Sequence, residues 1–226
     1  MANFTRSGSD WVLNDDLAPL AGDSIERRPR VLLGISASIA AYKAADIVSS
    51  LKKSGMEVRC VLTPSAREFV STLVLETLSG APALHELWGE RVSGTEHIDL
   101  ARWSDLVVIA PATANILAKM RMGLADDLLS TVALATRAPI WVAPAMNTAM
   151  LEAPATQENL SALRNRGVRV LDPATGVLAC GEEGAGKLAP VETICAEIEA
   201  FFATGLDGIG SSIEPTLEGR TILITA

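Results

Sequence analysis

The chain has 226 residues, of which 49% are hydrophobic and 20% charged, and its formal net charge is −8. This composition excludes an intrinsically disordered chain, and the acidic balance argues against nucleic-acid and anionic-membrane partners. The three cysteines and two histidines show no zinc-ligand spacing, and no apolar run is long enough to cross a bilayer. We therefore predict a soluble, cytoplasmic protein with no metal site.

Residues 1–29 show no clear hydrophobic period and end in the charged run ERRPR. Their start is polar and acidic, unlike a signal peptide, so we predict a flexible N-terminal arm. From residue 30 onward, short apolar runs alternate with helical patterns. The predicted strands are RVLLGIS (30–36), EVRCVLT (57–63), DLVVIAPAT (105–113), PIWVAPA (139–145) and VRVLDP (168–173). The predicted helices cover residues 38–55, 65–80, 114–123 and 127–136.

This alternation predicts an α/β fold, with a doubly wound, mostly parallel sheet in a Rossmann-like, flavodoxin-like three-layer single domain. We place that domain at residues 30–203. Residues 204–219 are rich in Gly, Ser and Pro and predict a linker. The apolar run RTILITA (220–226) predicts the first strand of a further domain that is truncated here.

Ligands of such sheets bind beyond the carboxyl ends of the strands. At the first predicted exit, Ser36 and Ser38 stand where a helix begins, and two hydroxyls beside unpaired N–H groups suit a phosphate. An ordinary N-capping role remains open for either serine. The dinucleotide fingerprint GxGxxG is absent, and the second strand ends at Thr63 rather than at an acidic residue. We therefore predict a mononucleotide phosphate site.

Two later exits, APATANILAK (110–119) and APAMNTAM (143–150), place Thr113, Asn115 and Asn147 at helix starts. Two Ala-Pro-Ala turns at neighbouring strand ends would form a flat surface that suits a planar ring, although ordinary helix caps are an alternative. His97 stands before the strand that starts at 105 and could act as a general base or bind a carboxylate. An unremarkable surface or core histidine is the other interpretation.

The segment GEEGAGK (181–187) has the spacing of a phosphate-binding P-loop, but Leu188 stands where a Ser or Thr should hold Mg²⁺. Pro190 would break the helix that must follow, so the sequence argues against a P-loop kinase. The glycines predict instead a mobile lid with Cys180 at its hinge, as an acid or a nucleophile. A buried structural thiol is the alternative.

Four segments together resemble the flavin-containing cysteine decarboxylase family: GISASIAAYKA, EHIDLARWSDLVVIAPATANILAKMRMGLADDLL, APAMNTAM and LACGEEGAGKLAP. The resemblance covers roughly residues 30–200. Within the family, the segments more specifically resemble members that decarboxylate 4′-phosphopantothenoylcysteine to 4′-phosphopantetheine in coenzyme A biosynthesis. RTILITA resembles the opening strand of the phosphopantothenate–cysteine ligase domain that follows in bifunctional members.

The resemblance implies bound FMN and a homo-oligomer: a trimer with active sites at subunit interfaces, often assembled into a dodecamer. By motif, the residues that would contact FMN are Gly34, Ser36, Ser38, Ile39, Thr63, Ala112, Thr113, Ala114, Asn115 and Met146. The residues that would contact substrate are Ala145, Met146, Asn147, Cys180 and Lys187. His97, Asn147 and Cys180 would be catalytic.

The implied reaction starts when FMN oxidises the thiol-bearing carbon to a thioaldehyde. Loss of CO₂ then gives an enethiolate, and reduced FMN returns a hydride while Cys180 supplies a proton. His97 would sit beside flavin and substrate, Asn147 would hold the substrate carboxylate, and Cys180 would lie on a flap over the substrate. The net reaction is redox-neutral, so it needs no external NAD(P)H.

This sequence departs from the family pattern at Lys187-Leu188, where many relatives have Arg-Met, and a lysine lacks the bidentate fork of an arginine. One alternative is a related peptidyl-cysteine decarboxylase, which the intact flap motif argues against. Another is a flavin-bearing regulatory subunit that inhibits a phosphatase. Retention of His97, Asn147 and Cys180 argues against that second alternative.

Overall fold

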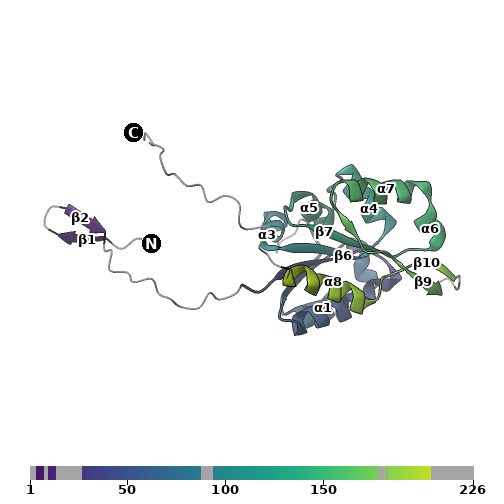
Figure 1. The fold of residues 1–226 in the computed structure, drawn as a ribbon, viewed down its shortest axis with the longest axis horizontal. Helices are drawn as coiled ribbons and strands as arrows, with labels where there is room; N and C mark the ends of the chain where they lie inside the picture. The colour runs from purple at the N-terminus through teal and green to yellow at the C-terminus, as the bar shows by residue number, and fades with distance from the viewer. Residues whose placement is uncertain are drawn as a thin grey trace.

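A computed structural model describes residues 4–7, 10–13, 27–87, 94–177, 181 and 183–204 (Figure 1). Its central sheet consists of β3 (Arg30–Ile35), β4 (Glu57–Leu62), β5 (Ala83–Leu84), β6 (Leu106–Ala112), β7 (Ile140–Pro144) and β8 (Arg169–Val170). Two antiparallel pairs lie outside that sheet, β1 (Phe4–Ser7) with β2 (Asp10–Leu13), and β9 (Ala174–Val177) with β10 (Glu183–Lys187).

The helices are α1 (Ala44–Lys53), α2 (Thr72–Ser79), α3 (Glu96–Trp103), α4 (Ala114–Met122), α5 (Leu128–Ala135), α6 (Thr148–Glu152), α7 (Pro154–Asn165) and α8 (Val191–Ala203). Short 3₁₀ helices, η1 (Ile39–Lys43) and η2 (Pro64–Glu68), follow β3 and β4. Among the described residues, none of these helices has the length and apolar character needed to cross a membrane.

The six strands of the central sheet are parallel at every pairing and run in the order β5-β4-β3-β6-β7-β8. The chain first builds outward from β3 to β5, then returns to the other side of β3 with β6. The direction of winding therefore reverses between β3 and β6, which makes this the topological switch point where doubly wound sheets bind ligands. The predicted fold class is confirmed.

Side chains alternate between two cores because successive strand residues point to opposite faces. In β3, Val31 and Leu33 face the core shared with α1 and α8, whereas Leu32 faces the core built with α4, α5 and α7. Figure 1 shows α1 and α8 on one face of the sheet and α3, α4, α5 and α7 on the other. Because helices cover both faces of the sheet, a ligand site is expected at the ends of the strands.

The pattern over 65–80 predicts one helix, and the structure shows two, η2 and α2. The break falls at residues 69–71, where Ser71 is extended and Val70 packs against the core instead of continuing a helical turn. Several elements have no counterpart among the predicted ones: β1, β2, β5, β9, β10, α3, α7 and α8. Of α6, only the start at Asn147 is predicted. Most of the predicted arm (1–29), nearly all of the predicted linker (204–219) and the predicted strand over 220–226 lie outside the described residues.

Candidate active site at the strand exits

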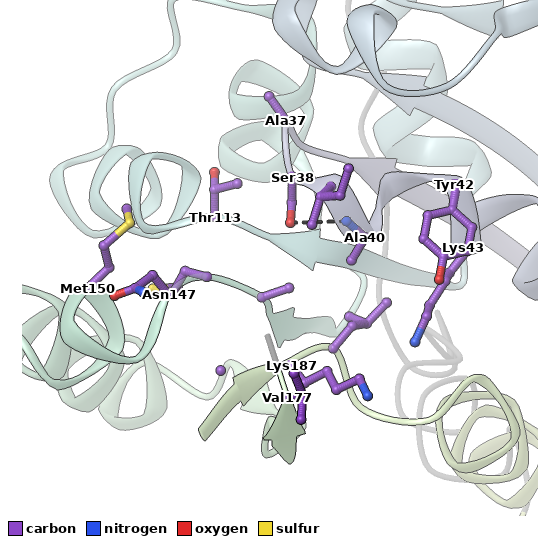
Figure 2. Close-up of a pocket in the computed structure, with 15 residues that line it drawn as sticks. Ala37, Ser38, Ala40, Tyr42, Lys43, Thr113, Asn147, Met150, Val177 and Lys187 are labelled. Carbon is purple, nitrogen blue, oxygen red and sulfur yellow. Dashed lines mark hydrogen bonds between the residues drawn. The ribbon is translucent and has the colours of Figure 1, made fainter. Parts of the chain in front are cut away.

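A cavity of about 460 Å³ opens at the carboxyl ends of β3, β6 and β7 (Figure 2). Its walls come from segment 37–43 after β3, Thr113 after β6, residues 145–150 after β7 and residues 186–188 at the end of β10. We call this the exit cavity. It lies beside the switch point, and its walls are mostly apolar with a few polar groups, as is typical of cofactor sites.

Three of its polar groups are helix caps. The Ser38 hydroxyl oxygen accepts a hydrogen bond from Ala40 N at 3.3 Å, and Thr113 Oγ1 accepts one from Ile116 N at 3.5 Å. Asn147 Oδ1 likewise accepts from Ala149 N at 2.8 Å. Capping through the oxygen leaves the hydroxyl hydrogens of Ser38 and Thr113 able to turn toward a ligand, so the capping role and the ligand role predicted for these two residues are compatible.

Ser36 does not line the exit cavity. Its hydroxyl is buried, donates to the Pro111 carbonyl at 2.7 Å and accepts from Thr113 N at 2.9 Å. Because a hydroxyl has one hydrogen, this arrangement leaves none for a phosphate. Ser36 instead joins the ends of β3 and β6, a role that the prediction of an FMN contact did not include.

Gly34 also has a packing role. A Cβ at this position would lie 2.5 Å from Leu129 Cδ1 of α5, so a side chain here would force that leucine to move. Ala112 is fully buried, Asn115 is exposed, and neither they nor Ala114 line the exit cavity. Four residues of the predicted FMN set do line it: Ser38, Ile39, Thr113 and Met146.

Thr63 follows β4 and is 8% exposed. Its Oγ1 has no hydrogen-bond partner among the described residues. A buried hydroxyl without a partner costs free energy, so native proteins rarely leave one unless a ligand or water completes it. A ligand or a water at this strand exit would complete the hydroxyl of Thr63.

Residues 183–187 of the P-loop-like segment form strand β10 rather than a loop before a helix. Its backbone docks on the start of α6, where Met146 N donates to Gly186 O at 2.9 Å and Thr148 Oγ1 donates to Ala185 O at 2.7 Å. A Cβ on Gly186 would overlap the Met146 carbonyl oxygen, and one on Gly184 would overlap Thr148 Oγ1. These two glycines therefore allow the backbone of β10 to approach residues 146–148 closely.

Two of the three predicted catalytic residues are not placed in the exit cavity. His97 is half-buried on α3 and does not line the cavity. Cys180 lies outside the described residues, between Val177 of β9 and Gly181. Asn147 does line it, together with Ala145, Met146 and Lys187 of the predicted substrate set.

The sequence argument missed several residues of the cavity wall. Tyr42 and Lys43 extend the wall begun by Ser38, and a helical continuation of SIAAYK would have indicated them. Met150 lies one helical turn after Met146, so its i+4 spacing was a usable signal. No sequence signal indicated Val177, because no strand was predicted there.

Of the three cysteines, Cys60 and Cys195 are free and buried, and neither lines the exit cavity. Burial raises the pKa of the Cys60 thiol to about 12, and burial is also the main cause of the raised pKa of Cys195. Both thiols stay protonated and inert at neutral pH. Among the described residues, no group of three or more His, Cys, Asp or Glu side chains could hold a metal ion.

A family model described as Flavoprotein matches residues 22–203. The Coenzyme A biosynthesis bifunctional protein CoaBC of Vibrio vulnificus (strain YJ016) is 42% identical over 198 residues, which make up 87% of this chain and 47% of that protein. The chain thus spans about half the length of the bifunctional relatives it matches.

Two solved structures are similar over their whole length. A PPC decarboxylase, a cysteine-to-serine mutant complexed with pantothenoylaminoethenethiol, has 34% identity and a TM-score of 0.70, with 78% of this chain and 100% of that chain covered. The FMN binding protein AtHal3 has 35% identity and a TM-score of 0.68, with 79% and 98% covered.

Proposed function

This chain belongs to the Flavoprotein family, and on that premise we propose that it binds FMN and decarboxylates 4′-phosphopantothenoylcysteine to 4′-phosphopantetheine in coenzyme A biosynthesis. The observation that carries the proposal is the exit cavity at the switch point, with the Asn147 turn on one wall and β10 docked against it. The similarity to a PPC decarboxylase over its whole length supports the same substrate.

The described residues fit FMN. Thr63 offers a buried hydroxyl without a partner, and Ser38 and Thr113 offer capping hydroxyls at two helix starts. Apolar side chains of Ile39 and Met146 supply walls for a planar ring. FMN, when bound, supplies a two-electron oxidation and re-reduction of the thiol-bearing carbon, which gives the departing CO₂ an electron sink.

Asn147 would orient the substrate carboxylate. Its Oδ1 accepts the N–H of Ala149, and the same amide carries an NH₂ group, the half that can donate to a carboxylate. The surrounding Ala145, Met146 and Met150 are apolar. A carboxylate placed among them gives up much of its hydration, which favours the change from charged carboxylate to neutral CO₂.

Cys180 would supply the proton that completes the product. It stands in the connection between β9 and β10, and Val177 and Gly186 of those strands line the exit cavity. The other two cysteines are buried and do not line the cavity. We also propose that the protein acts in the cytoplasm, where the free thiols of Cys60 and Cys195 would stay reduced.

His97 would reach the site from a second copy of the chain in a trimer, and trimers would assemble into a dodecamer. Four large apolar side chains at the exit cavity are strongly exposed, namely Ile39, Tyr42, Met150 and Val177. An apolar rim of this kind is typical of a surface that a ligand or a partner covers. In the full-length chain a phosphopantothenate–cysteine ligase domain would follow.

The test is the visible spectrum of the purified protein, the mass of what it releases on denaturation, and turnover of 4′-phosphopantothenoylcysteine. We expect flavin bands, the mass of FMN, and release of CO₂ with formation of 4′-phosphopantetheine. A colourless protein that FMN does not reconstitute would contradict the whole proposal. Turnover of cysteine-ending peptides alone would favour the peptidyl-cysteine decarboxylase, and flavin without any turnover would favour the regulatory subunit.

A further inference from the structure

The side chain of Thr148 joins two segments of the exit cavity wall that lie far apart in the sequence. Thr148 is the first residue of α6, and its Oγ1 donates a hydrogen bond of 2.7 Å to Ala185 O of β10, 37 residues further along the chain. Thr148 does not line the exit cavity, whereas its neighbours Met146 and Asn147 do. A role of Thr148 in turnover must therefore act through the elements that it joins.

Strand β10 departs from a regular strand where it meets this contact. The register of the β9–β10 pair shifts between Ala185 and Lys187, so Gly186 has no Cα partner in β9. The Gly186 carbonyl instead accepts a hydrogen bond from Met146 N at 2.9 Å. An irregularity of this kind bends a strand and redirects its backbone groups. Among the described residues, Met146 and Thr148 thus supply two hydrogen bonds that hold β10 against the start of α6.

The bond from Thr148 is the one of these two that a substitution can remove, because the other joins two backbone groups. Thr148 is half-buried, and a Cβ on Gly184 would overlap its Oγ1, so the hydroxyl fits closely against β10. A neutral hydrogen bond shifts the equilibrium between a bonded and an open form by roughly threefold to tenfold. The position of β10 is therefore sensitive to a single hydroxyl.

We propose that Thr148 is a positioning residue that keeps β10 seated against the Asn147 turn until the reduced product has formed. This inference rests on the proposed function. In that function, loss of CO₂ gives an enethiolate, which then takes up two electrons from the reduced cofactor and two protons, one of them from Cys180 in the connection between β9 and β10. When β10 is not seated, the enethiol leaves before this last step, and its two electrons stay on the cofactor.

Loss of this contact and a general distortion of the site have different signatures. A variant that only distorts the site loses CO₂ release and product formation in the same proportion. A variant in which β10 is not seated still releases CO₂, because the Asn147 turn keeps its own cap from Asn147 Oδ1 to Ala149 N. Its oxidised product then accumulates. The ratio of enethiol to 4′-phosphopantetheine therefore measures the seating of β10.

The experiment is a single turnover of 4′-phosphopantothenoylcysteine by excess FMN-loaded protein without oxygen, with CO₂, enethiol and 4′-phosphopantetheine measured by mass spectrometry. Thr148→Val and Thr148→Ala remove the hydroxyl, and Thr148→Ser keeps it. The matched control is Thr131→Val on α5, because Thr131 is also half-buried and its Oγ1 also donates at 2.7 Å to a carbonyl, that of Asp127. We expect the ratio of enethiol to 4′-phosphopantetheine to rise roughly threefold to tenfold in Thr148→Val and Thr148→Ala. Thr148→Ser and the control should keep the wild-type ratio.

Trypsin cleavage after Lys187 tests the seating of β10 without turnover. Lys187 is exposed but Leu188 is buried, so cleavage between them requires β10 to leave its place. We expect cleavage at this bond to be roughly threefold to tenfold faster in Thr148→Val than in wild type. The Thr131→Val control should be cleaved there at the wild-type rate.

Three results would overturn the inference and leave the proposed function standing. They are an unchanged product ratio in Thr148→Val and Thr148→Ala, a raised ratio that Thr148→Ser shares although it keeps the hydroxyl, and a raised ratio without faster cleavage after Lys187. A wild-type protein that binds FMN and releases no CO₂ would instead overturn the proposed function, and the inference with it.

Discussion

Removal of the Thr63 hydroxyl should have opposite effects on the stability of the protein and on cofactor binding. Thr63→Val removes a buried polar atom that has no partner among the described residues, so the FMN-free protein should gain about 1 kcal/mol in free energy of unfolding. The same change would remove the proposed hydrogen bond to FMN and should raise the Kd for FMN by about tenfold. Urea unfolding and flavin fluorescence titration measure the two effects.

Thr77→Val is a suitable control, because Thr77 is exposed on α2 and its hydroxyl donates to Leu73 O of the same helix. It should leave the Kd for FMN unchanged. A Thr63→Val variant that is less stable without FMN, and that binds FMN with an unchanged Kd, would contradict this prediction. The hydroxyl would then have a structural partner and no role in cofactor binding.

Gly186 is a described position that tolerates a side chain poorly. Its φ of +128° disfavours any other residue, and a Cβ would overlap the Met146 carbonyl oxygen. Gly186→Ala should therefore lower the free energy of unfolding by about 3 kcal/mol and reduce turnover, because the Asn147 turn is displaced. Thermal unfolding and steady-state kinetics would show both effects.

Gly181 provides the matched comparison. It also has a positive φ, +85°, but no described atom lies within 4 Å of an added Cβ. Gly181→Ala should cost only the backbone penalty of about 1 kcal/mol. Equal losses in the two variants would show that strain alone, and not the contact with Met146, limits position 186.

Single residues were predictable where their signal is local. Ser38, Thr113 and Asn147 each stand between a strand and a helix, and the capping rule uses only those few residues. Ser36 carries the same kind of hydroxyl, but its partner Pro111 is 75 residues away in the chain. The sequence pattern contains no information on that pairing, so Ser36 was assigned to the ligand.

Among the secondary-structure elements, α4 and α5 meet at a charge cluster that responds to pH. Lys119 near the end of α4 bonds Asp126 and Asp127, the latter being the N-cap of α5 with a complete capping box. Burial lowers the pKa of Lys119, and the bonds and charges of the two aspartates raise it by more. The pKa of the exposed Asp126 is lowered, first by its hydrogen bond with Lys119.

The two shifts define a pH window for the Lys119–Asp126 pair. A carboxyl whose pKa falls on folding stabilises the protein above its unfolded-state pKa, and loses this contribution as pH falls through the folded-state value. A lysine whose pKa rises on folding stabilises below its unfolded-state pKa, and loses this as pH rises through the folded-state value. Asp126→Asn should thus be less stable than wild type at neutral pH and converge with it at both extremes.

Denaturant unfolding across the pH range measures that difference, with Glu152→Gln, an exposed carboxyl on α6, as the control. The control should follow the wild-type curve. A difference between Asp126→Asn and wild type that stays constant at all pH values would show that the pair contributes nothing through its charges.

The predictability of an element followed the strength of its periodic signal. The buried strands β3, β6 and β7 have continuous apolar runs and were located within one or two residues. The pair β9–β10 consists largely of small and polar residues, with glycines that fit against α6, so its pattern indicates a loop. The pair forms strands because β10 packs against residues 146–148, and the local sequence pattern does not indicate this contact.

On the scale of the whole molecule, the separation of His97 from the exit cavity predicts complementation between subunits. Chains with His97→Asn and chains with Asn147→Asp should each be inactive. When the two are co-expressed, about one site in three of each mixed trimer would combine a native His97 with a native Asn147 from different chains. Activity of the purified mixed oligomer, with a distinct tag on each chain, measures this.

Co-expression of either variant with a chain carrying both substitutions is the control, and it should stay inactive. Activity no higher than the control in the mixed oligomer would mean that each chain builds its site alone. The sequence could not decide this question, since the distance between α3 and the strand exits depends on the finished fold rather than on any motif around His97.

The docking of β10 on the start of α6 has a consequence for how such enzymes diversify. Gly184 and Gly186 let β10 pack directly against residues 146–148. Two hydrogen bonds join β10 to these residues, although the two segments lie almost 40 residues apart in the sequence. A graft of β9–β10 from a relative with another substrate will fail unless residues 146–148 travel with it. Recombination and laboratory evolution should therefore treat the two distant segments as one heritable module.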